Sequence, residues 1–211
     1  MSAFGRHTAT RKSGSLLQDR KGRQRHPGGT ARHLLWQEHG NTVIHSSDPF
    51  ATPESARSDV RRLRGRLAQT VTLWTAPGPA GLTVSSCLVA DGSPGRVLGL
   101  IDEESDLWAV LERERVFAVT PLTPGEKQLA DRFAGLLPAP GGLFKQGETW
   151  TGTRYGPVLA SATTWAGCTL DSARPFGWAL LIEATISAVT LGEPAPPLLH
   201  HRGSYGHLAG R

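Results

Sequence analysis

The chain contains few residues of the kinds that build disulfide or metal frameworks. Its 211 residues include only two cysteines, Cys87 and Cys168, and each lies within an apolar run. This placement favours buried free thiols over a disulfide or a metal site. The sequence also lacks CxxC and HExxH patterns, which argues against a structural zinc or a zinc-protease site. We therefore expect no metal.

Long apolar segments are missing as well. No apolar run approaches the roughly 18 residues that span a bilayer, and the first residues lack the apolar core of a secretory signal. We expect a cytoplasmic protein with no membrane partner. By contrast, the chain is rich in glycine (25), proline (15) and tryptophan (6). This composition favours a loop-rich β or α+β domain over a helical bundle.

Acidic residues are almost absent from the first 33 positions, which hold eight arginines and lysines against the single acid Asp19. That segment carries +7 in a chain of net charge +5, so the remaining residues carry −2. We predict a disordered basic extension over residues 1–50, because it has too little apolar surface to offset the entropy of ordering. A nucleic-acid or partner-binding arm is an alternative, as is a tail outside the working protein. Nucleic-acid binding would depend on this tail alone.

The ordered domain is predicted over residues 51–211. Thr52 and Pro53 suit a helix start, and four apolar residues then recur at helical spacing. They predict an amphipathic helix of about four turns that lies on the rest of the domain; they are Ala56, Val60, Leu63 and Leu67. A second helix is expected just after Ser105, and a third after the capping-box pattern Thr123–Glu126.

The rest of the domain has the patterns of β-strands. Around Leu180–Ala188 apolar and polar residues alternate, as in a strand with one buried face. Expected strands cover residues 71–76, 82–89 (interrupted by hydroxyl residues), 96–101, 116–122, 157–170, 176–191 and 198–201. About six main strands with helices at the rim predict a mainly β fold, a closed Greek-key barrel with peripheral helices.

Residues 81–86 are the first segment whose side chains and backbone could bind a ligand. Gly81 permits a tight bend, while Thr83, Ser85 and Ser86 present short hydroxyls and accessible backbone N–H groups. Such a surface suits the carbonyls, N5 and phosphate of a flavin. From the residues alone, an ordinary polar strand edge is the preferred explanation.

A second segment begins where a strand runs into a helix. Ser105 can cap that helix and leave free N–H groups at its start, which is a site for an anion such as a phosphate. A plain N-cap is the alternative. The acids nearby would repel a dianion unless they face solvent or an arginine compensates. We name Arg132, next to the Phe133-Ala134 pair, and Arg202 as candidates.

The third segment lies near the C-terminus. Gly203 lets the backbone approach a ligand, while His201 and Tyr205 offer a ring and a hydrogen-bond donor. An exposed, frayed terminus is the alternative. His200 and His201 are adjacent, so on a strand they face opposite sides and do not form a metal-binding pair.

Taken in order, the segments 81–86, 102–107 and 201–206 resemble those of the flavin reductase family, which has the FMN-binding split-barrel fold. The resemblance covers roughly residues 55–208. It implies a six-stranded Greek-key split barrel that binds FMN (or FAD), with hydride passing from NAD(P)H to flavin N5. It assigns catalytic roles to His201 and Tyr205. The implied cofactor-binding residues are Gly81, Thr83, Val84, Ser85, Ser86, Ser105, Phe133, Ala134, Arg202 and Gly203.

The resemblance also implies partners. Split-barrel flavoproteins are homodimers with the site at the interface, and the reduced flavin can pass to a partner monooxygenase. Residues 140–144 and 165–168 resemble an actinobacterial-type branch. Nicotinamide-using members often carry an Asp-His pair where this chain has Arg174–Trp178 without a histidine. Two alternatives therefore stay open: a split-barrel flavoprotein with another donor such as the deazaflavin F420, and a non-catalytic flavin- or nucleic-acid-binding module.

Overall fold

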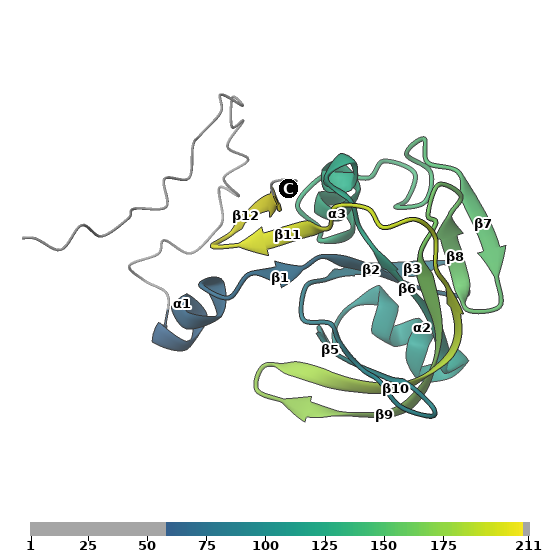
Figure 1. Cartoon of the computed structure of the whole chain (residues 1–211), viewed down its shortest axis with the longest axis horizontal. Coiled ribbons are helices and arrows are strands. Elements are labelled where there is room, and N and C mark those ends of the chain that lie inside the picture. Colours follow the sequence, from purple (N-terminus) through teal and green to yellow (C-terminus); the bar gives the residue numbers. More distant parts are fainter. Residues whose placement is uncertain (1–57, 209–211) are drawn as a thin grey trace, which may run out of the picture. The chain divides into compact units, whose positions relative to one another are not determined.

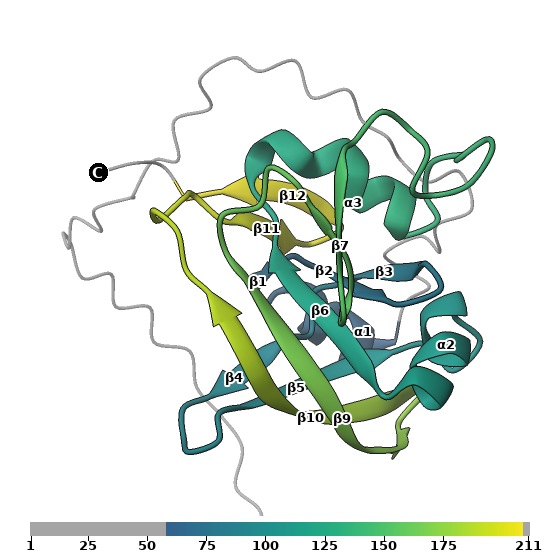
Figure 2. The ribbon, with the colours of Figure 1, turned by 90° about the vertical axis from the view of Figure 1, so that its right-hand side faces the viewer.

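A computed structural model describes residues 58–208 (Figures 1 and 2). The predicted disordered extension and the Thr52-Pro53 helix start lie outside these residues. The described elements are mainly β-strands with a few short helices. In chain order they are α1 (Asp59–Gly65), β1 (Gln69–Thr70), β2 (Thr72–Ala76), β3 (Ala80–Val84), β4 (Leu88–Ala90), β5 (Arg96–Ile101), α2 (Asp106–Glu114), β6 (Val116–Pro121), the 3-10 turn η2 (Pro124–Glu126), α3 (Lys127–Phe133), β7 (Trp150–Thr153), β8 (Gly156–Leu159), β9 (Trp165–Phe176), β10 (Ala179–Thr190), β11 (Leu198–His201) and β12 (Ser204–His207).

The main sheet is antiparallel and has seven strands in the order β3-β2-β6-β9-β10-β5-β4. Its two outermost strands, β3 and β4, are joined by only residues 85–87, so the two edges of the sheet must lie close together. The Ser86 hydroxyl ties this connection to β5: it accepts from Leu100 N at 2.8 Å and donates to Leu100 O at 3.0 Å. The sheet is thus a barrel split along one seam.

The predicted mainly β split barrel is confirmed, with two differences in detail. The main sheet contains seven strands where six were expected. Its edge strands β3 and β4 are linked by residues 85–87, whereas a fully closed barrel was expected. Backbone pairing between β3 and β4 is absent from the ladders found over residues 58–208.

An aromatic pair organises the barrel interior. The rings of Trp74 and Phe117 stack with centroids 4.7 Å apart, and both side chains are fully buried. Trp74 Nε1 donates to Thr72 Oγ1 at 3.0 Å, which satisfies its polar atom inside the core. Gly99 leaves room for the indole, because a Cβ there would lie 2.5 Å from a ring carbon. Replacing such a buried ring by alanine costs about 3–5 kcal/mol.

Helices α2 and α3 form where the sequence predicted them. Ser105 caps α2, and Leu107 and Leu111 point into the barrel core. The capping box is present at η2, where Thr123 N donates to the Glu126 carboxylate at 2.6 Å. It leads into α3, whose apolar residues enter a second core cluster.

The prediction for α1 is wrong in two respects. The helix begins after an N-cap at Ser58 and has seven residues, so it is shorter than the four turns expected. It also does not lie on the barrel, because none of its residues is buried and Val60 and Leu63 are 77% and 61% exposed. An apolar period predicts a face that needs a partner, but it does not say where the partner is.

A three-stranded sheet, β1-β11-β12, stands beside the barrel (Figure 1). It is anchored where backbone hydrogen bonds link Val71, Leu122 and Leu198. The β11–β12 hairpin turns at Arg202 and Gly203, which have φ of 53° and 83°. The sequence pattern predicts β11 but gives no sign of β12. The predicted strand 157–170 is in fact divided between β8 and β9.

Candidate functional site

The first predicted segment lies on β3, against α3. Thr83 Oγ1 donates to the Ala130 carbonyl at 2.8 Å, which fixes the strand to the helix. Gly81 faces the Phe133 ring, and a Cβ there would lie 2.7 Å from Cε1. Packing against Phe133 therefore requires a glycine at this position, whether or not a ligand binds. Val84 and Phe133 are core residues, each about 2% exposed.

The second group gathers where β5 ends. Ser86 bonds to Leu100, the penultimate residue of β5, and Ser105 follows five residues later at the start of α2. The Ser105 hydroxyl donates to Asp102 O at 2.6 Å and accepts from Trp108 N at 3.2 Å. First-turn N–H groups of a helix have no intrahelical acceptor, so the start of α2 still offers donors to an anion.

The acids around Ser105 are less of an obstacle than the sequence suggested. Asp102 Oδ1 accepts from Glu104 N at 2.9 Å, so this carboxylate is directed at its own turn. Glu103 and Asp106 are exposed to solvent. A hollow of about 360 Å³ lies beside Asp106, and Lys145 lines it. Lys145 is therefore a cation near the start of α2 that the sequence analysis did not name.

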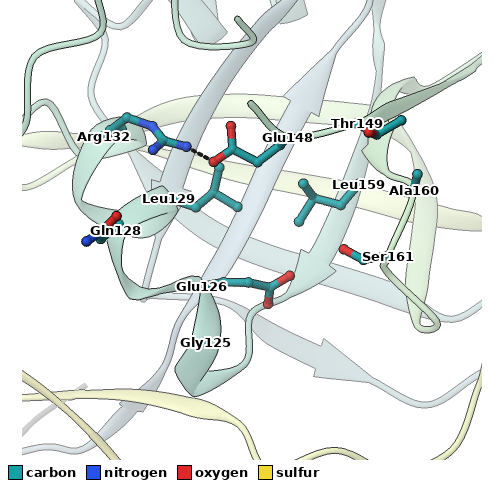
Figure 3. A pocket seen from close by; sticks show the side chains of 10 residues that line it. All are labelled: Gly125, Glu126, Gln128, Leu129, Arg132, Glu148, Thr149, Leu159, Ala160 and Ser161. Carbon is teal, nitrogen blue, oxygen red and sulfur yellow. Dashed lines mark hydrogen bonds and ion pairs between the residues drawn. The ribbon is translucent and has the colours of Figure 1, made fainter. Parts of the chain in front are cut away.

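Arg132 does not compensate these acids as proposed from the sequence. Its side chain is only 11% exposed and forms an ion pair with Glu148 (Figure 3). Arg132 Nε and Glu148 Oε2 are buried and have no hydrogen-bond partner among the residues described. The pair lines a separate hollow of about 430 Å³ between η2, α3 and the end of β8. The guanidinium is thus already neutralised.

The third group is the C-terminal hairpin. His201, Arg202 and Gly203 are exposed at its turn, where a Cβ on Gly203 would meet nothing within 4 Å. His200 is half-buried and packs edge-on against Tyr205, with centroids 5.8 Å apart. The opposite orientation of the two histidines matches the alternation expected on a strand. Burial lowers the pKa of His200, and the charges of Arg64 and His201 lower it further.

Tyr205 packs against the apolar cluster that α3 joins, and Asp131 of α3 is only 6% exposed. Burial raises the pKa of Asp131, although Lys127 and Tyr205 partly oppose this effect. Burial and the neighbouring Asp131 raise the pKa of Tyr205. The sequence analysis did not name Asp131. An acid between Leu129 and Phe133 of a buried helix was the available signal.

The structure therefore brings the predicted residues into two neighbourhoods. Thr83 bonds to α3 and Tyr205 packs against the cluster that α3 joins, while Ser86 and Ser105 lie at the end of β5. The 360 Å³ hollow touches both Gly81 of the first group and Asp106 beside Ser105. Ser85 is half-buried between the groups along the chain, and Ala134 is exposed at the end of α3.

The fold is thus a split barrel with a hollow between β3 and the start of α2. The family model described as "Flavin reductase like domain" matches residues 64–209. The chain belongs to the flavin reductase-like family, which confirms the resemblance seen in the sequence.

Individual relatives agree with this assignment. FMN reductase (NADH) RutF of Methylorubrum populi is 30% identical over 167 residues, covering 77% of this chain and 81% of that protein. The flavin-dependent monooxygenase reductase subunit HsaB of Rhodococcus jostii is 28% identical over 154 residues, 70% of this chain and 77% of its own. The structure of the NADH:FAD oxidoreductase SgcE6 of Streptomyces globisporus superposes with a TM-score of 0.66 at 22% identity, over 76% and 98% of the two chains.

The described region also bears on other classes of site. No helix between residues 58 and 208 combines the length and the apolar character that a bilayer-spanning segment needs. Within the same residues, no three His, Cys, Asp or Glu side chains gather as a metal-binding group would. Cys87 and Cys168 are both free, and burial raises the pKa of these thiols to about 11 and about 12.

Proposed function

We propose that the chain is an NAD(P)H:flavin oxidoreductase whose flavin lies against β3, the start of α2 and the β11–β12 turn. The family match over residues 64–209 is the observation that carries the activity. The position of the flavin is supported by the open backbone at Gly203 and by the hollow between Gly81 and Asp106. FMN is the proposed cofactor, since the RutF relative is named an FMN reductase; FAD is the alternative.

The flavin supplies the redox chemistry when it is bound, because it accepts hydride from a nicotinamide. The chain's own residues bind and orient it. The first-turn N–H groups of α2 would hold the phosphate, with Ser105 fixing the helix start and Lys145 adding positive charge. Ser85 and the backbone near Thr83 would face the ring system, and the His201–Gly203 turn would cover it. Because the flavin would supply the redox chemistry, the chain needs no acid–base pair of its own.

The proposed hydride donor is NADH. Two of the relatives reported above carry NADH in their names. The absence of an Asp-His pair near residue 176 means that nicotinamide must be held in another way. Phe176 and Trp178 are both largely exposed at the tip of the β9–β10 hairpin, and they offer ring surfaces for stacking.

The proposed acceptor of the reduced flavin is a separate monooxygenase, because HsaB is the reductase subunit of such a system. A homodimer is also proposed. The apolar residues of α1 are exposed in the single chain, and a second copy would cover them. Sedimentation of the full chain tests the dimer. The cytoplasm is the proposed location.

The test of the activity uses the purified full chain. FMN is added under anaerobic conditions, then NADH, NADPH or reduced F420, and bleaching of the yellow flavin is followed by stopped-flow absorbance. Rapid bleaching with NADH is expected. Bleaching by reduced F420 alone would favour the deazaflavin alternative. Absence of flavin binding would refute the proposal and favour a non-catalytic module.

A further inference from the structure

Residues 134–149 connect α3 to β7 and contain no helix or strand. The two ends of this 134–149 loop meet, because Arg132 of α3 forms an ion pair with Glu148, which lies 16 residues later (Figure 3). Next to the pair, the rings of Phe133 and Trp150 approach each other with centroids 5.9 Å apart. A long loop whose ends lie close together is typical of Ω-loops, which frequently have a function.

The loop is also packed by its own side chains. The Phe144 ring lies edge-on to Phe133, with centroids 5.1 Å apart, and edge-on to Trp150, with centroids 4.8 Å apart. Gln146 Nε2 donates to the Pro140 carbonyl at 2.6 Å, which closes the tip of the loop. The shape of the loop therefore depends on these contacts within it and on the ion pair at its base.

The tip of the loop lies beside the proposed flavin site. Residues 141–145 line the 360 Å³ hollow together with Gly81 of β3 and Asp106 at the start of α2. Lys145 is exposed, and it takes part in none of the ion pairs within residues 58–208. A cation next to a helix N-terminus suits a phosphate. The place of Lys145 is therefore the means by which this loop can affect flavin binding.

We propose that Arg132 and Glu148 are positioning residues for the flavin phosphate. Their ion pair closes the base of the 134–149 loop and thereby holds Lys145 beside the start of α2. This inference rests on the proposed function. In this role neither Arg132 nor Glu148 contacts the flavin, and both act on the phosphate only through Lys145.

The burial of the pair makes it suitable for this role. Exposed ion pairs contribute little, because solvent screens them. Here the side chains of Arg132 and Glu148 are only 11% and 24% exposed. Removing the Glu148 carboxylate leaves the guanidinium partly buried without its partner, which favours its release to solvent. The base of the loop then opens more often, and Lys145 loses its fixed place relative to α2.

Limited trypsin digestion of the full chain measures how often the loop opens. Lys145 is the only lysine or arginine in residues 134–149, so a fragment that begins at Gln146 reports cleavage within the loop. Mass spectrometry follows this fragment in the wild type, in Glu148→Ala and in the exchanged pair Arg132→Glu/Glu148→Arg. Leu136→Ala, which truncates a 54% exposed side chain of the same loop, is the control. Glu148→Gln keeps the shape of the side chain and replaces Glu148→Ala if the latter does not fold.

Glu148→Ala should speed cleavage after Lys145 about tenfold, the effect of losing one charge-assisted hydrogen bond from a local opening equilibrium. The exchanged pair and Leu136→Ala should be cleaved close to the wild-type rate. In absorbance titrations, Glu148→Ala and Lys145→Ala should each weaken FMN binding about two- to fivefold. The Glu148→Ala/Lys145→Ala double variant should be no worse than either single variant. Riboflavin, which has no phosphate, should bind equally well to all of them.

The same coupling must appear in the opposite direction. If the closed loop strengthens FMN binding, FMN must favour the closed loop by the same factor. Saturating FMN should therefore slow cleavage after Lys145 in the wild type about two- to fivefold, and riboflavin should not. A purely structural role for the pair would lower thermal stability and weaken both flavins alike.

Three outcomes would overturn the positioning role. If FMN protects the wild-type loop no better than riboflavin does, the tip lies away from the phosphate. If Glu148→Ala leaves both cleavage and FMN affinity unchanged, or weakens FMN and riboflavin equally, the ion pair does not position Lys145. In both cases a wild type that still reduces flavin with NADH leaves the proposed function standing. If the wild type binds no flavin at all, the proposed function fails first, and the positioning role fails with it.

Discussion

Replacing Ser86 by alanine separates a structural from a ligand-binding role for the serine pair at residues 85–86. Ser86 makes two hydrogen bonds to Leu100, at 2.8 and 3.0 Å, which tie the β3–β4 connection to β5. Each such bond contributes about 0.5–1.5 kcal/mol, and a stranded backbone group adds a desolvation cost. Because Ser86 is half-buried and water can partly replace it, we expect a loss of about 2 kcal/mol in unfolding free energy.

For a domain of this size, a loss of that order lowers Tm by about 4–8 °C. Ser85→Ala is the matched control, since its hydroxyl has no hydrogen bond among the residues described. That variant should unfold like the wild type but bind FMN several-fold more weakly if Ser85 faces the flavin. Urea unfolding and FMN titration measure both quantities. Unchanged stability in Ser86→Ala would refute the view that this side chain holds the β3–β4 connection to β5.

Three further predictions follow from single residues. Gly81→Ala forces a Cβ against the Phe133 ring and should lower the free energy of unfolding in urea by about 1–3 kcal/mol. Gly152→Ala is the control, because a Cβ there meets nothing within 4 Å, and it should not lower this free energy. Equal losses in the two variants would contradict the packing argument. Burial raises the pKa of Asp131 above 3.8 despite Lys127 and Tyr205. The stability that this carboxyl contributes is therefore full below pH 3.8 and is lost as the pH rises through the raised pKa. In a series of thermal melts, Asp131→Asn should remove this slope of stability against pH, and a slope that persists would point to another group. Lys145→Glu should weaken FMN binding about two- to fivefold, and by more at low salt. Riboflavin binding should be unchanged, because riboflavin has no phosphate. An equal loss of riboflavin affinity would place Lys145 away from the phosphate.

Local signals in the sequence were enough to place most elements. The Ser105 cap and the Thr123–Glu126 capping box located α2 and α3, because a cap depends only on neighbours a few residues away. The alternation along Leu180–Ala188 located β10 for the same reason. The interruption of the 82–89 strand was also correct, as residues 85–87 form the connection between β3 and β4.

Features that depend on distant partners were not predictable in this way. Arg132 was expected to face a phosphate, but its partner Glu148 lies 16 residues later at the end of a loop. Ser86 was assigned to a flavin, whereas the structure shows it bonded to Leu100. β12 was missed because its four residues, Ser204–His207, have no local strand pattern. Asp131 was missed although an acid between the buried residues Leu129 and Phe133 was an available signal.

The same reasoning explains why residues of a binding motif need not be binding residues. In residues 81–86, Gly81, Thr83, Val84 and Ser86 each have a structural role that a ligand does not require. A sequence pattern preserved by packing would look identical to one preserved by a flavin. Ser85 is the member of the segment without such a role, so the ligand-binding hypothesis for this strand depends most directly on its side chain and on the exposed backbone beside it.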